Sequence, residues 1–304
     1  MRIVFMGTPD FAVPTLTALH QAGHEVALVV AQPDKRSGRG KKLRKPPVAQ
    51  CALDLGLPLS QPRAIFTGRF PERYVAIEPD VTVVIAYGRI LKPIHLDTPK
   101  HGAVNLHASL LPRWRGAAPL QAALLAGDTE TGVCAQRMEL GLDTGDVYLE
   151  RRIPIDPRET AGTLHDKLAA LSAEVALETL EGLAERVPVP QAEQGITWAP
   201  KIEKRDGQLD LGLPAAQLDR RIRAMTPWPG GWIPGEAGPL KIVSATPIEG
   251  RGEPGRVLLT RPLVVGTGDG ALRLDRVQAP GRKPVSGVDF ANGLRLVPGA
   301  NLWD

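Results

Sequence analysis

Hydrophobic positions near the start of the chain alternate between short continuous runs and a helical spacing. The run Arg2–Met6 ends in Gly7 and predicts a strand that is buried on both faces. Apolar residues then recur every third position through Val13–Ala22, which predicts a helix, and Glu25–Ala31 is a second β-rich run. A strand, a helix and a strand within about thirty residues predict the βαβ unit of a parallel sheet.

The same pattern continues to about residue 190. Three further apolar runs predict strands, and leucines along one side of Thr163–Glu185 predict a long helix. The predicted strands are Val81–Ala86, Ala103–His107 and Gly132–Met138. Prolines and polar residues then interrupt the pattern and predict a linker over 191–205.

Beyond the predicted linker, short β-type segments alternate with glycine and proline turns. One helical stretch, Leu209–Met225, comes first. The predicted strands are Leu240–Ser244, Arg256–Leu259, Leu263–Thr267 and Ala271–Val277. Short strands separated by turns are typical of a small barrel. The sequence therefore predicts an α/β protein, with a Rossmann-like, mostly parallel sheet domain over 1–190 and a smaller C-terminal, OB-like β-barrel domain over 206–304.

The composition of the 304-residue chain narrows the class of protein. Hydrophobic residues make up 43% and charged residues 23%, which excludes a disordered chain, a collagen-like repeat and a disulfide scaffold. No apolar run approaches the roughly 18–20 residues that span a bilayer, and the apolar start is too short for a signal peptide. We therefore expect a cytoplasmic protein with no membrane partner. Cys51 and Cys134 have no metal-ligand spacing, and we expect both to be buried free thiols.

The net charge of +4 is unevenly distributed along the chain. Residues 1–200 carry 22 basic and 22 acidic side chains, whereas residues 201–304 carry 15 basic and 11 acidic ones. This asymmetry is a mild indication that the C-terminal domain has a polyanionic partner.

A denser basic cluster lies between Lys35 and Lys45, with seven basic residues, two glycines and no acidic residue. It follows a predicted strand, so we expect an exposed loop at the carboxyl end of the sheet. Such a loop is either simply solvated or a flexible arm that grips phosphates.

The glycine turns near the N-terminus do not match nucleotide-binding motifs. The turn after the first strand, MGTPDF, lacks the second and third glycines of G-x-G-x-x-G, which argues against an NAD site. The stretch SGRGKK lacks both the spacing and the hydroxyl residue of a P-loop, which argues against ATP chemistry.

The densest group of polar residues lies at the end of the strand predicted over Ala103–His107. Asn105 and His107 face the same side of that strand, and burying them is costly unless they form hydrogen bonds or take part in chemistry. One alternative is a structural histidine that caps the strand. Downstream, Asp143 lies in a turn between two apolar stretches. An amide donor, a titratable imidazole and an orienting carboxylate are the parts of an acyl-transfer site that uses no covalent nucleophile.

These residues lie in two motifs that resemble those of the 10-formyltetrahydrofolate-dependent formyltransferases. Asn105–Pro112 is similar to that family's Asn-x-His-x-Ser-Leu-Leu-Pro motif, and Leu142–Gly145 is similar to its downstream Asp motif. Three further features resemble the methionyl-tRNA formyltransferase branch of the family. They are the opening Gly7–Phe11, the basic segment Gln32–Lys42 and the Trp/Pro segment Pro227–Trp232. The resemblance extends over essentially all 304 residues.

The resemblance implies the reaction. The formyl group of 10-formyltetrahydrofolate would move to the α-amino group of methionine on initiator methionyl-tRNA, for translation initiation. Attack of the amine on the formyl carbon produces a negative oxygen, which the Asn105 amide and protonated His107 are suited to stabilise by hydrogen bonds. Asp143 would orient His107, and His107 or a water held by Asp143 would relay the proton to folate N10.

The resemblance also implies where each partner binds. The residues implied to contact folate are Ser109, Leu110, Leu111 and Pro112, and the loops Ile85–Leu91 and Met138–Asp143 would wall the pterin. The residues implied to contact tRNA are Arg39, Lys41 and Lys42. Arg39 is the strongest of these candidates, because an arginine can grip a phosphate with two hydrogen bonds. No metal is implied, and we expect a monomer.

Two other functions remain open from the sequence. A formyltransferase or formyl-folate hydrolase acting on a small-molecule amine, such as glycinamide ribonucleotide, would use the same three residues. It would leave the basic segment and the C-terminal domain without a role. A catalytically silent RNA-binding protein would leave Asn105, His107 and Asp143 as polar residues at strand ends. A comparison of formyl transfer to charged initiator tRNA and to glycinamide ribonucleotide distinguishes the three functions.

Overall fold

The computed structural model describes residues 1–37 and 42–303, so Arg39 and Lys41 lie outside the described residues. The chain forms two compact units. The N-terminal unit comprises Met1–Pro119, Glu130–Pro154 and His165–Ala199, and the C-terminal unit comprises Leu120–Thr129, Ile155–Leu164 and Pro200–Asp304. Two short segments therefore pack with the C-terminal part of the chain although they precede it in sequence.

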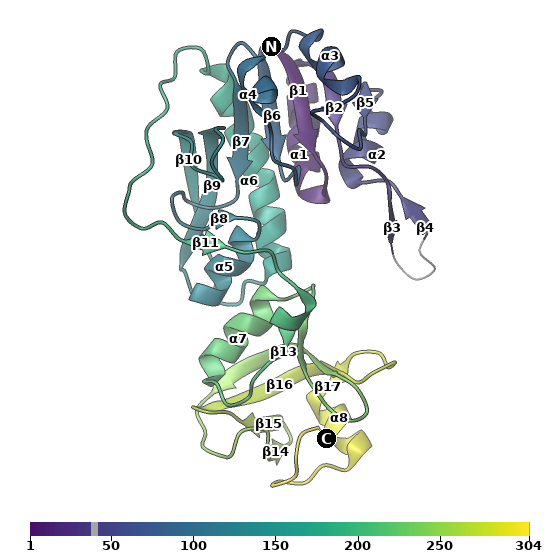
Figure 1. Cartoon of the computed structure of the whole chain (residues 1–304). Helices are drawn as coiled ribbons and strands as arrows, with labels where there is room; N and C mark the ends of the chain where they lie inside the picture. Colours follow the sequence, from purple (N-terminus) through teal and green to yellow (C-terminus); the bar gives the residue numbers. More distant parts are fainter. Residues whose placement is uncertain (38–41, 304) are drawn as a thin grey trace. The chain divides into compact units, whose positions relative to one another are not determined.

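A seven-stranded sheet forms the centre of the N-terminal unit (Figure 1). Its strand order is β10-β9-β7-β6-β1-β2-β5. The bounds are β1 (Arg2–Gly7), β2 (Glu25–Val30), β5 (Leu59–Ser60), β6 (Val81–Ile85), β7 (Ala103–His107), β9 (Glu130–Arg137) and β10 (Val147–Pro154). The five neighbouring strands β7, β6, β1, β2 and β5 pair in parallel. In contrast, β9 pairs antiparallel with β7, and β10 pairs antiparallel with β9. The predicted Rossmann-like, mostly parallel sheet is therefore confirmed.

The parallel strands are continuous apolar runs because such sheets are covered on both faces. All five positions of β6 are buried, as are five of the six positions of β1. The helices of this unit are η1 (Asp10–Ala12), α1 (Val13–Gln21), α2 (Pro47–Asp54), α3 (Phe70–Val75), α4 (Pro93–Asp97) and most of α6 (Ala161–Glu181). The sequence did not predict β10, because this edge strand has only half-buried and exposed positions and so shows no apolar run.

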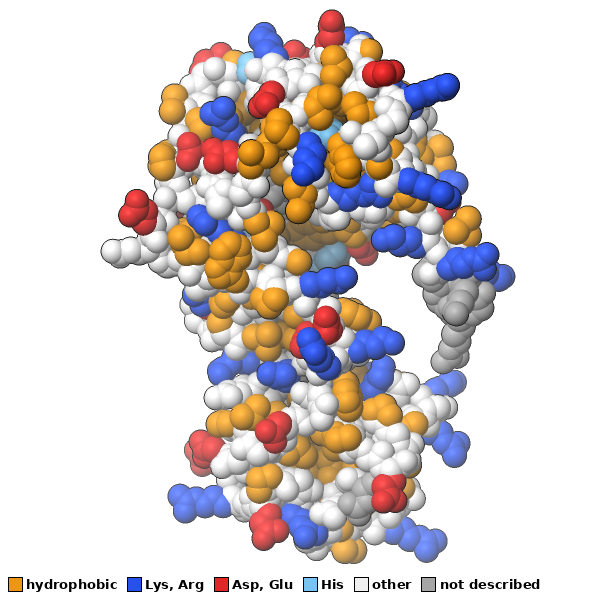
Figure 2. Space-filling view, in the orientation of Figure 1, with side chains coloured by type: hydrophobic (Ala, Val, Ile, Leu, Met, Phe, Trp, Pro, Cys, Tyr) orange, Lys and Arg blue, Asp and Glu red, His pale blue; other side chains and the backbone are white. Residues whose placement is uncertain are grey.

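The described parts of the basic segment after β2 are two paired strands, called the β3–β4 hairpin below, rather than the predicted loop. Its strands β3 (Lys35–Ser37) and β4 (Lys42–Arg44) pair antiparallel, with Lys35 opposite Arg44. Figure 1 shows this hairpin apart from the seven-stranded sheet, and Figure 2 shows basic side chains in blue on it. Lys42 is exposed, as predicted for this segment. Strand pairing thus orders the backbone while the described basic side chains remain in solvent.

An antiparallel sheet forms the centre of the C-terminal unit. Its order is β12-β13-β16-β15-β14, with β17 paired to β16. The bounds are β12 (Gly231–Ile233), β13 (Leu240–Ile248), β14 (Val257–Thr260), β15 (Leu263–Gly266), β16 (Ala271–Gln278) and β17 (Val285–Ser286). The helices are most of α5 (Pro119–Ala126), η2 (Lys204–Gly207), α7 (Ala215–Ala224) and α8 (Gly287–Leu294). Of these, α7 and α8 share the apolar core of the sheet. Closure of this sheet into an OB-like barrel stays a prediction.

The helix α7 is shorter than the predicted stretch Leu209–Met225. It begins only after Pro214, because a residue that precedes proline is disfavoured in the helical conformation. Upstream, Gly212 N donates a hydrogen bond to Asp210 Oδ1 at 2.9 Å, which forms a turn in place of the expected first helical turn.

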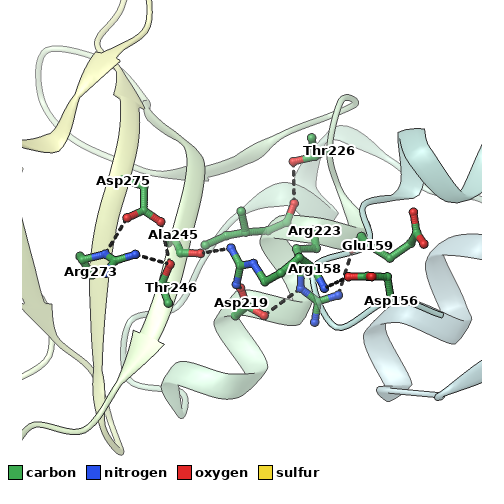
Figure 3. A network of polar contacts seen from close by, with 11 residues as sticks. Asp156, Arg158, Glu159, Asp219, Arg223, Thr226, Ala245, Thr246, Arg273 and Asp275 are labelled. Carbon is green, nitrogen blue, oxygen red and sulfur yellow. Dashed lines mark hydrogen bonds and ion pairs between the residues drawn. The ribbon is translucent and has the colours of Figure 1, made fainter.

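A network of charged side chains fastens the segment Ile155–Leu164 within the C-terminal unit (Figure 3). Arg158 donates to Asp219 Oδ1 at 3.0 Å and to a carbonyl oxygen of β13 at 2.7 Å. Arg223 donates to Asp219 Oδ2 at 2.8 Å and to the carbonyl oxygen of Glu159 at 3.0 Å. Asp219 is buried, and the two guanidinium groups compensate the desolvation of its carboxylate. These bonds explain why this segment packs with residues far away in sequence.

Both cysteines are free thiols, but only Cys134 is buried. Burial raises the pKa of Cys134 to about 12, so its thiol stays protonated and unreactive. Cys51 is half-buried, and the prediction of burial is wrong for this residue. The reason is that α2 turns a different side, formed by Val48, Ala49 and Ala52, into the core.

His95 is a fully buried histidine whose burial lowers its pKa. Its Nδ1 accepts a hydrogen bond from the backbone N–H of Lys92 at 3.2 Å, and its Nε2 donates to the carbonyl oxygen of Ile65 at 3.0 Å. The unfolded chain takes up this proton near pH 6.5, whereas the folded protein takes it up only at lower pH. We therefore expect stability to fall as the pH decreases from about 6.5 towards the folded pKa of His95.

Urea unfolding of the wild type and of His95→Gln between about pH 5 and pH 7.5 tests this expectation. The variant should lose part of the pH dependence of the free energy of unfolding. His24, whose pKa burial also lowers, accounts for part of the slope that remains. An unchanged slope in His95→Gln would contradict the prediction.

Candidate active site

The polar cluster predicted from the sequence lies at the carboxyl ends of the parallel strands. Asn105 and His107 are at the end of β7, with their side chains on the same side of the strand. The strand order reverses at β1, which has β2 on one side and β6 on the other. In open α/β sheets, ligands bind outside the carboxyl ends of the strands near such a reversal. The cluster lies at this carboxyl edge of the sheet, with β6 between its own strand, β7, and β1.

The turn between β9 and β10 brings Asp143 to the end of β7. Asp143 Oδ1 lies 3.5 Å from Asn105 Nδ2 and 3.6 Å from His107 Nδ1. The same oxygen accepts a hydrogen bond from Gln136 Nε2 at 2.9 Å, and Gln136 is opposite Asn105 in the antiparallel pairing of β9 with β7. The fold thus gathers the three predicted residues around one carboxylate oxygen.

Short hydrogen bonds fix the Asp143 carboxylate from both sides. Gly116 N donates to Oδ2 at 2.9 Å, which complements the bond from Gln136 to Oδ1. The contacts of Asn105 and His107 with Oδ1 are longer than good hydrogen bonds. Asp143 also has a φ of 53°, in the left-handed region that residues other than glycine rarely adopt. Its position is therefore held by the bonds from Gln136 and Gly116 against a backbone preference.

Both ring nitrogens of His107 face oxygen atoms. Nε2 lies 2.9 Å from the carbonyl oxygen of Trp114, which can only accept, so Nε2 carries a hydrogen and donates it. Nδ1 faces the Asp143 carboxylate, and the His107 side chain is 6% exposed. The carbonyl of Trp114 therefore orients the ring, while Asp143 approaches it from the other side.

Two short strands form the wall behind these residues. β8 (Arg115–Gly116) pairs in parallel with β11 (Trp198–Ala199), beside each other in Figure 1. A Cβ atom on Gly116 would lie 2.6 Å from the carbonyl oxygen of Ala199, and Gly116 has a φ of +121°. Only glycine fits this close approach, which lets the backbone N–H of Gly116 reach the Asp143 carboxylate.

The segment predicted to contact folate packs partly inward. Ser109 is fully buried, and its hydroxyl donates to the carbonyl oxygen four residues later at 2.6 Å. Leu111 is also buried, and its backbone N–H donates to the Sγ of Cys134 at 3.4 Å. Leu110 and Pro112 are half-buried. Ser109 and Leu111 thus hold the shape of the turn, and Leu110 and Pro112 leave more of their surface accessible.

The loop after β6, implied to wall the pterin, is tied to its neighbours at the same edge of the sheet. Thr8 Oγ1 and Gln32 Nε2 donate to the carbonyl oxygen of Tyr87 at 3.0 and 3.2 Å. The Tyr87 ring is 2% exposed, and burial raises the pKa of its hydroxyl, which has no hydrogen-bond partner among the described residues. The loops that follow β1, β2 and β6 therefore form one connected rim.

Sequence reasoning missed two residues whose side chains contact Asp143. Gln136 is a polar residue at the end of the apolar run of β9, which is a usable signal, but its partner depends on the strand register. Gln191 lies in the predicted linker and donates to the carbonyl oxygens of Asp143 and Gly145 at 2.9 and 2.7 Å. Nothing in the sequence distinguishes Gln191 from Gln194 three residues later.

Neither a metal-binding cluster nor a membrane-spanning helix is found in the described part of the chain. Over residues 1–37 and 42–303, no three His, Cys, Asp or Glu side chains come close enough together to hold a metal ion. Within the same ranges, no helix combines the length and the apolar character needed to cross a bilayer.

Comparison with known proteins places this site in a family. The family described as Formyl transferase matches residues 1–180, and the one described as Formyl transferase, C-terminal domain, matches residues 201–295. A methionyl-tRNA formyltransferase of Ruegeria pomeroyi is 47% identical over 304 residues, which cover 99% of this chain and 100% of the relative.

Solved structures share the fold at lower identity. HypX from Aquifex aeolicus, in complex with tetrahydrofolic acid, has a TM-score of 0.64 at 20% identity, over 96% of this chain. This chain spans only 47% of HypX. A methionyl-tRNA formyltransferase from Clostridium thermocellum has a TM-score of 0.57 at 16% identity, over 81% of this chain and 93% of that one. With family matches in both parts of the chain and a relative nearly half identical along its whole length, the chain belongs to the formyl transferase family, among the methionyl-tRNA formyltransferases.

Proposed function

We propose that this protein transfers the formyl group of 10-formyltetrahydrofolate to the α-amino group of methionine on initiator methionyl-tRNA. One observation carries the proposal. Asn105, His107 and Asp143 meet at the carboxyl edge of the sheet in a chain that is 47% identical to a methionyl-tRNA formyltransferase. The product starts protein synthesis, so the reaction belongs in the cytoplasm.

The reaction exchanges one C–N bond for another. The neutral amine of the methionyl group attacks the formyl carbon, and the formyl oxygen becomes negative as the new C–N bond forms. Collapse of this tetrahedral centre breaks the bond between the carbon and folate N10. The proton lost by the amine reaches N10, and the products are formylmethionyl-tRNA and tetrahydrofolate. The site must therefore stabilise an oxyanion and relay a proton.

Asn105 is the proposed donor to the oxyanion. Its side chain is half-buried, and its contact with Asp143 at 3.5 Å is too long to be a firm hydrogen bond. Its amide N–H is thus available to a ligand oxygen near the end of β7. The His107 ring, held between the Trp114 carbonyl and Asp143, lies beside that oxygen and contributes to its electrostatic stabilisation. His107 or a water held by Asp143 relays the proton to N10.

Folate is proposed to bind against Ser109–Pro112 and the loops that follow β6 and β9. The half-buried Leu110 and Pro112 offer apolar surface to a planar ring, while Ser109 holds the turn. The complex of HypX with tetrahydrofolic acid supports a folate site on this fold.

The tRNA is proposed to contact the β3–β4 hairpin and a cationic patch on the C-terminal unit. The patch consists of four exposed residues, Lys241, Arg276, Arg282 and Lys283. Lys241 is opposite Gln278 on the outer face of the sheet, and Arg276 lies on the same face of β16, two residues before Gln278. Arg282 and Lys283 lie in the turn that follows β16. None of the four has an ion-pair partner among the described residues. Unpaired cations on one end of a sheet suit the phosphates of a nucleic acid.

Arg39→Ala should weaken the use of methionyl-tRNA and leave folate binding intact. The reason is that Arg39 belongs in sequence to the basic segment between Lys35 and Lys45, and an arginine can grip a phosphate with two hydrogen bonds. We expect the KM for methionyl-tRNA to rise about tenfold, which corresponds to the loss of about 1.4 kcal/mol of binding. Steady-state formylation and equilibrium binding of a folate analogue measure the two effects separately.

Arg69→Ala is the control for this experiment, since Arg69 is an exposed arginine of the same unit outside the hairpin. It should leave both constants unchanged. Equal losses of tRNA use and folate binding in Arg39→Ala would mean that the hairpin serves the folate pocket or the fold instead.

A direct assay tests the proposed function against its alternatives. The purified protein is given 10-formyltetrahydrofolate with charged initiator tRNA, with glycinamide ribonucleotide or with no amine. Formylation of the tRNA alone is the expected result. Formylation of glycinamide ribonucleotide would support a small-molecule enzyme, loss of formyl-folate without an amine would support a hydrolase, and tRNA binding without turnover would support a silent RNA-binding protein.

A further inference from the structure

Gln191 bridges the two chain segments that hold Asp143. Its Nε2 donates to the carbonyl oxygens of Asp143 and Gly145 at 2.9 and 2.7 Å. Its Oε1 accepts from Nε and Nη2 of Arg115 at 3.1 and 2.7 Å. Arg115 directly precedes Gly116, whose N–H donates to the Asp143 carboxylate. One amide therefore ties the turn that carries Asp143 to the strand that carries its hydrogen-bond donor.

The chemistry of the partners determines the orientation of this amide. Backbone carbonyls can only accept and a guanidinium can only donate, so the NH₂ group faces the turn and the oxygen faces Arg115. A side chain must offer two donors and one acceptor to make these bonds. Glutamate, which has acceptors alone when ionised, cannot make the bonds to the turn.

Two anchors hold Gln191 in place. Upstream, Val189 exchanges two backbone hydrogen bonds with Val147 of β10, at 2.8 and 2.9 Å. Downstream, Thr197 accepts from the backbone N–H of Trp114 through its hydroxyl and from that of Arg115 through its carbonyl, each at 2.9 Å. The segment between the two family matches is therefore part of the wall of the site.

We propose that Gln191 is a positioning residue for the Asp143 carboxylate; this inference rests on the proposed function. Asp143 adopts a φ of 53°, which costs free energy unless surrounding bonds hold the turn. Without Gln191, the turn relaxes and the carboxylate moves away from His107 and from the N–H of Gly116. Gln191 does not touch the reacting atoms, so its effect passes through Asp143.

The first test compares Gln191→Ala and Gln191→Glu with Gln194→Ala. Gln194 is exposed, has the same side chain and lies three residues away, so it is the matched control. We expect Gln191→Ala to lower kcat by about 10- to 100-fold, the range typical of residues that orient a catalytic group, with little change in the KM values for tRNA and folate. Gln191→Glu keeps the contact with Arg115 and should also lower kcat. A wild-type kcat in a folded Gln191→Glu protein would overturn the proposal, even if Gln191→Ala failed to fold.

A double-mutant cycle provides the second test. If Gln191 acts through Asp143, then adding Gln191→Ala to Asp143→Ala should produce little further loss of the single-turnover rate. An independent structural role would instead give losses that multiply, and this result would overturn the proposal. Failure of the proposed function is recognised separately, because the wild type would then not formylate methionyl-tRNA at all.

Discussion

Asp143→Ala and His107→Ala are each expected to lower kcat for formylation of methionyl-tRNA by at least about 100-fold, the low end for lost acid–base catalysis. The two groups lie 3.6 Å apart at the end of β7, where the proposed oxyanion and proton relay are located. Loss of Asp143 removes a negative charge beside His107 and the acceptor for Gln136 and Gly116. Single-turnover kinetics with saturating 10-formyltetrahydrofolate isolate the chemical step from product release.

Asp146→Ala is the matched control for Asp143→Ala, because Asp146 is a half-buried carboxylate three residues later in the chain. It should keep kcat within about twofold of the wild type. Folding should survive in both catalytic variants, since each unpaired donor or acceptor costs only about 1–3 kcal/mol. Wild-type turnover in a folded Asp143→Ala or His107→Ala protein would remove that residue from the mechanism.

Arg282→Ala combined with Lys283→Ala is expected to weaken tRNA binding by about 10- to 30-fold at 0.15 M salt. Each phosphate contact releases counterions and contributes about 0.7–0.9 to the slope of log K against log salt concentration. Removing two contacts should therefore flatten this slope by about 1.4–1.8. Binding of fluorescent initiator tRNA over a range of salt concentrations measures both quantities, and folate binding should stay unchanged.

Arg251→Ala combined with Arg256→Ala removes the same charge from the opposite end of the C-terminal sheet. Both residues lie in the connection from β13 to β14, near the start of β16. Arg282 and Lys283, in contrast, follow the end of β16. This control should keep the slope of the wild type. If both double variants have the wild-type slope and affinity, the cationic patch is not the tRNA surface and the assignment is wrong.

The elements that the sequence predicted well are those with a continuous apolar pattern. β1, β2, β6 and β7 are buried on both faces, so their runs of Val, Ile and Leu are visible without any knowledge of their neighbours. The edge strand β10 and the hairpin β3–β4 were missed. Their stability depends on pairing with another strand, and solvent-facing positions leave no apolar signature.

The catalytic candidates were visible because polar side chains at the end of an apolar strand are conspicuous. Asn105 and His107 have this property, and Asp143 lies in a turn flanked by apolar residues. Their motifs also indicated the family, which the comparisons confirmed. The bond from His107 to the Trp114 carbonyl was not visible, because a backbone carbonyl carries no residue identity.

The sequence by itself determined the α/β class, the parallel strands and the three candidate residues, because local periodicity and residue chemistry specify them. Only the tertiary structure decided which groups hold Asp143. Gln136 reaches it through the register of β9 on β7, Gly116 through the close approach of β8 and β11, and Gln191 through a segment predicted to be a linker. These contacts join residues between 7 and 48 positions apart and depend on strand pairing and loop paths, which no local pattern in the chain encodes.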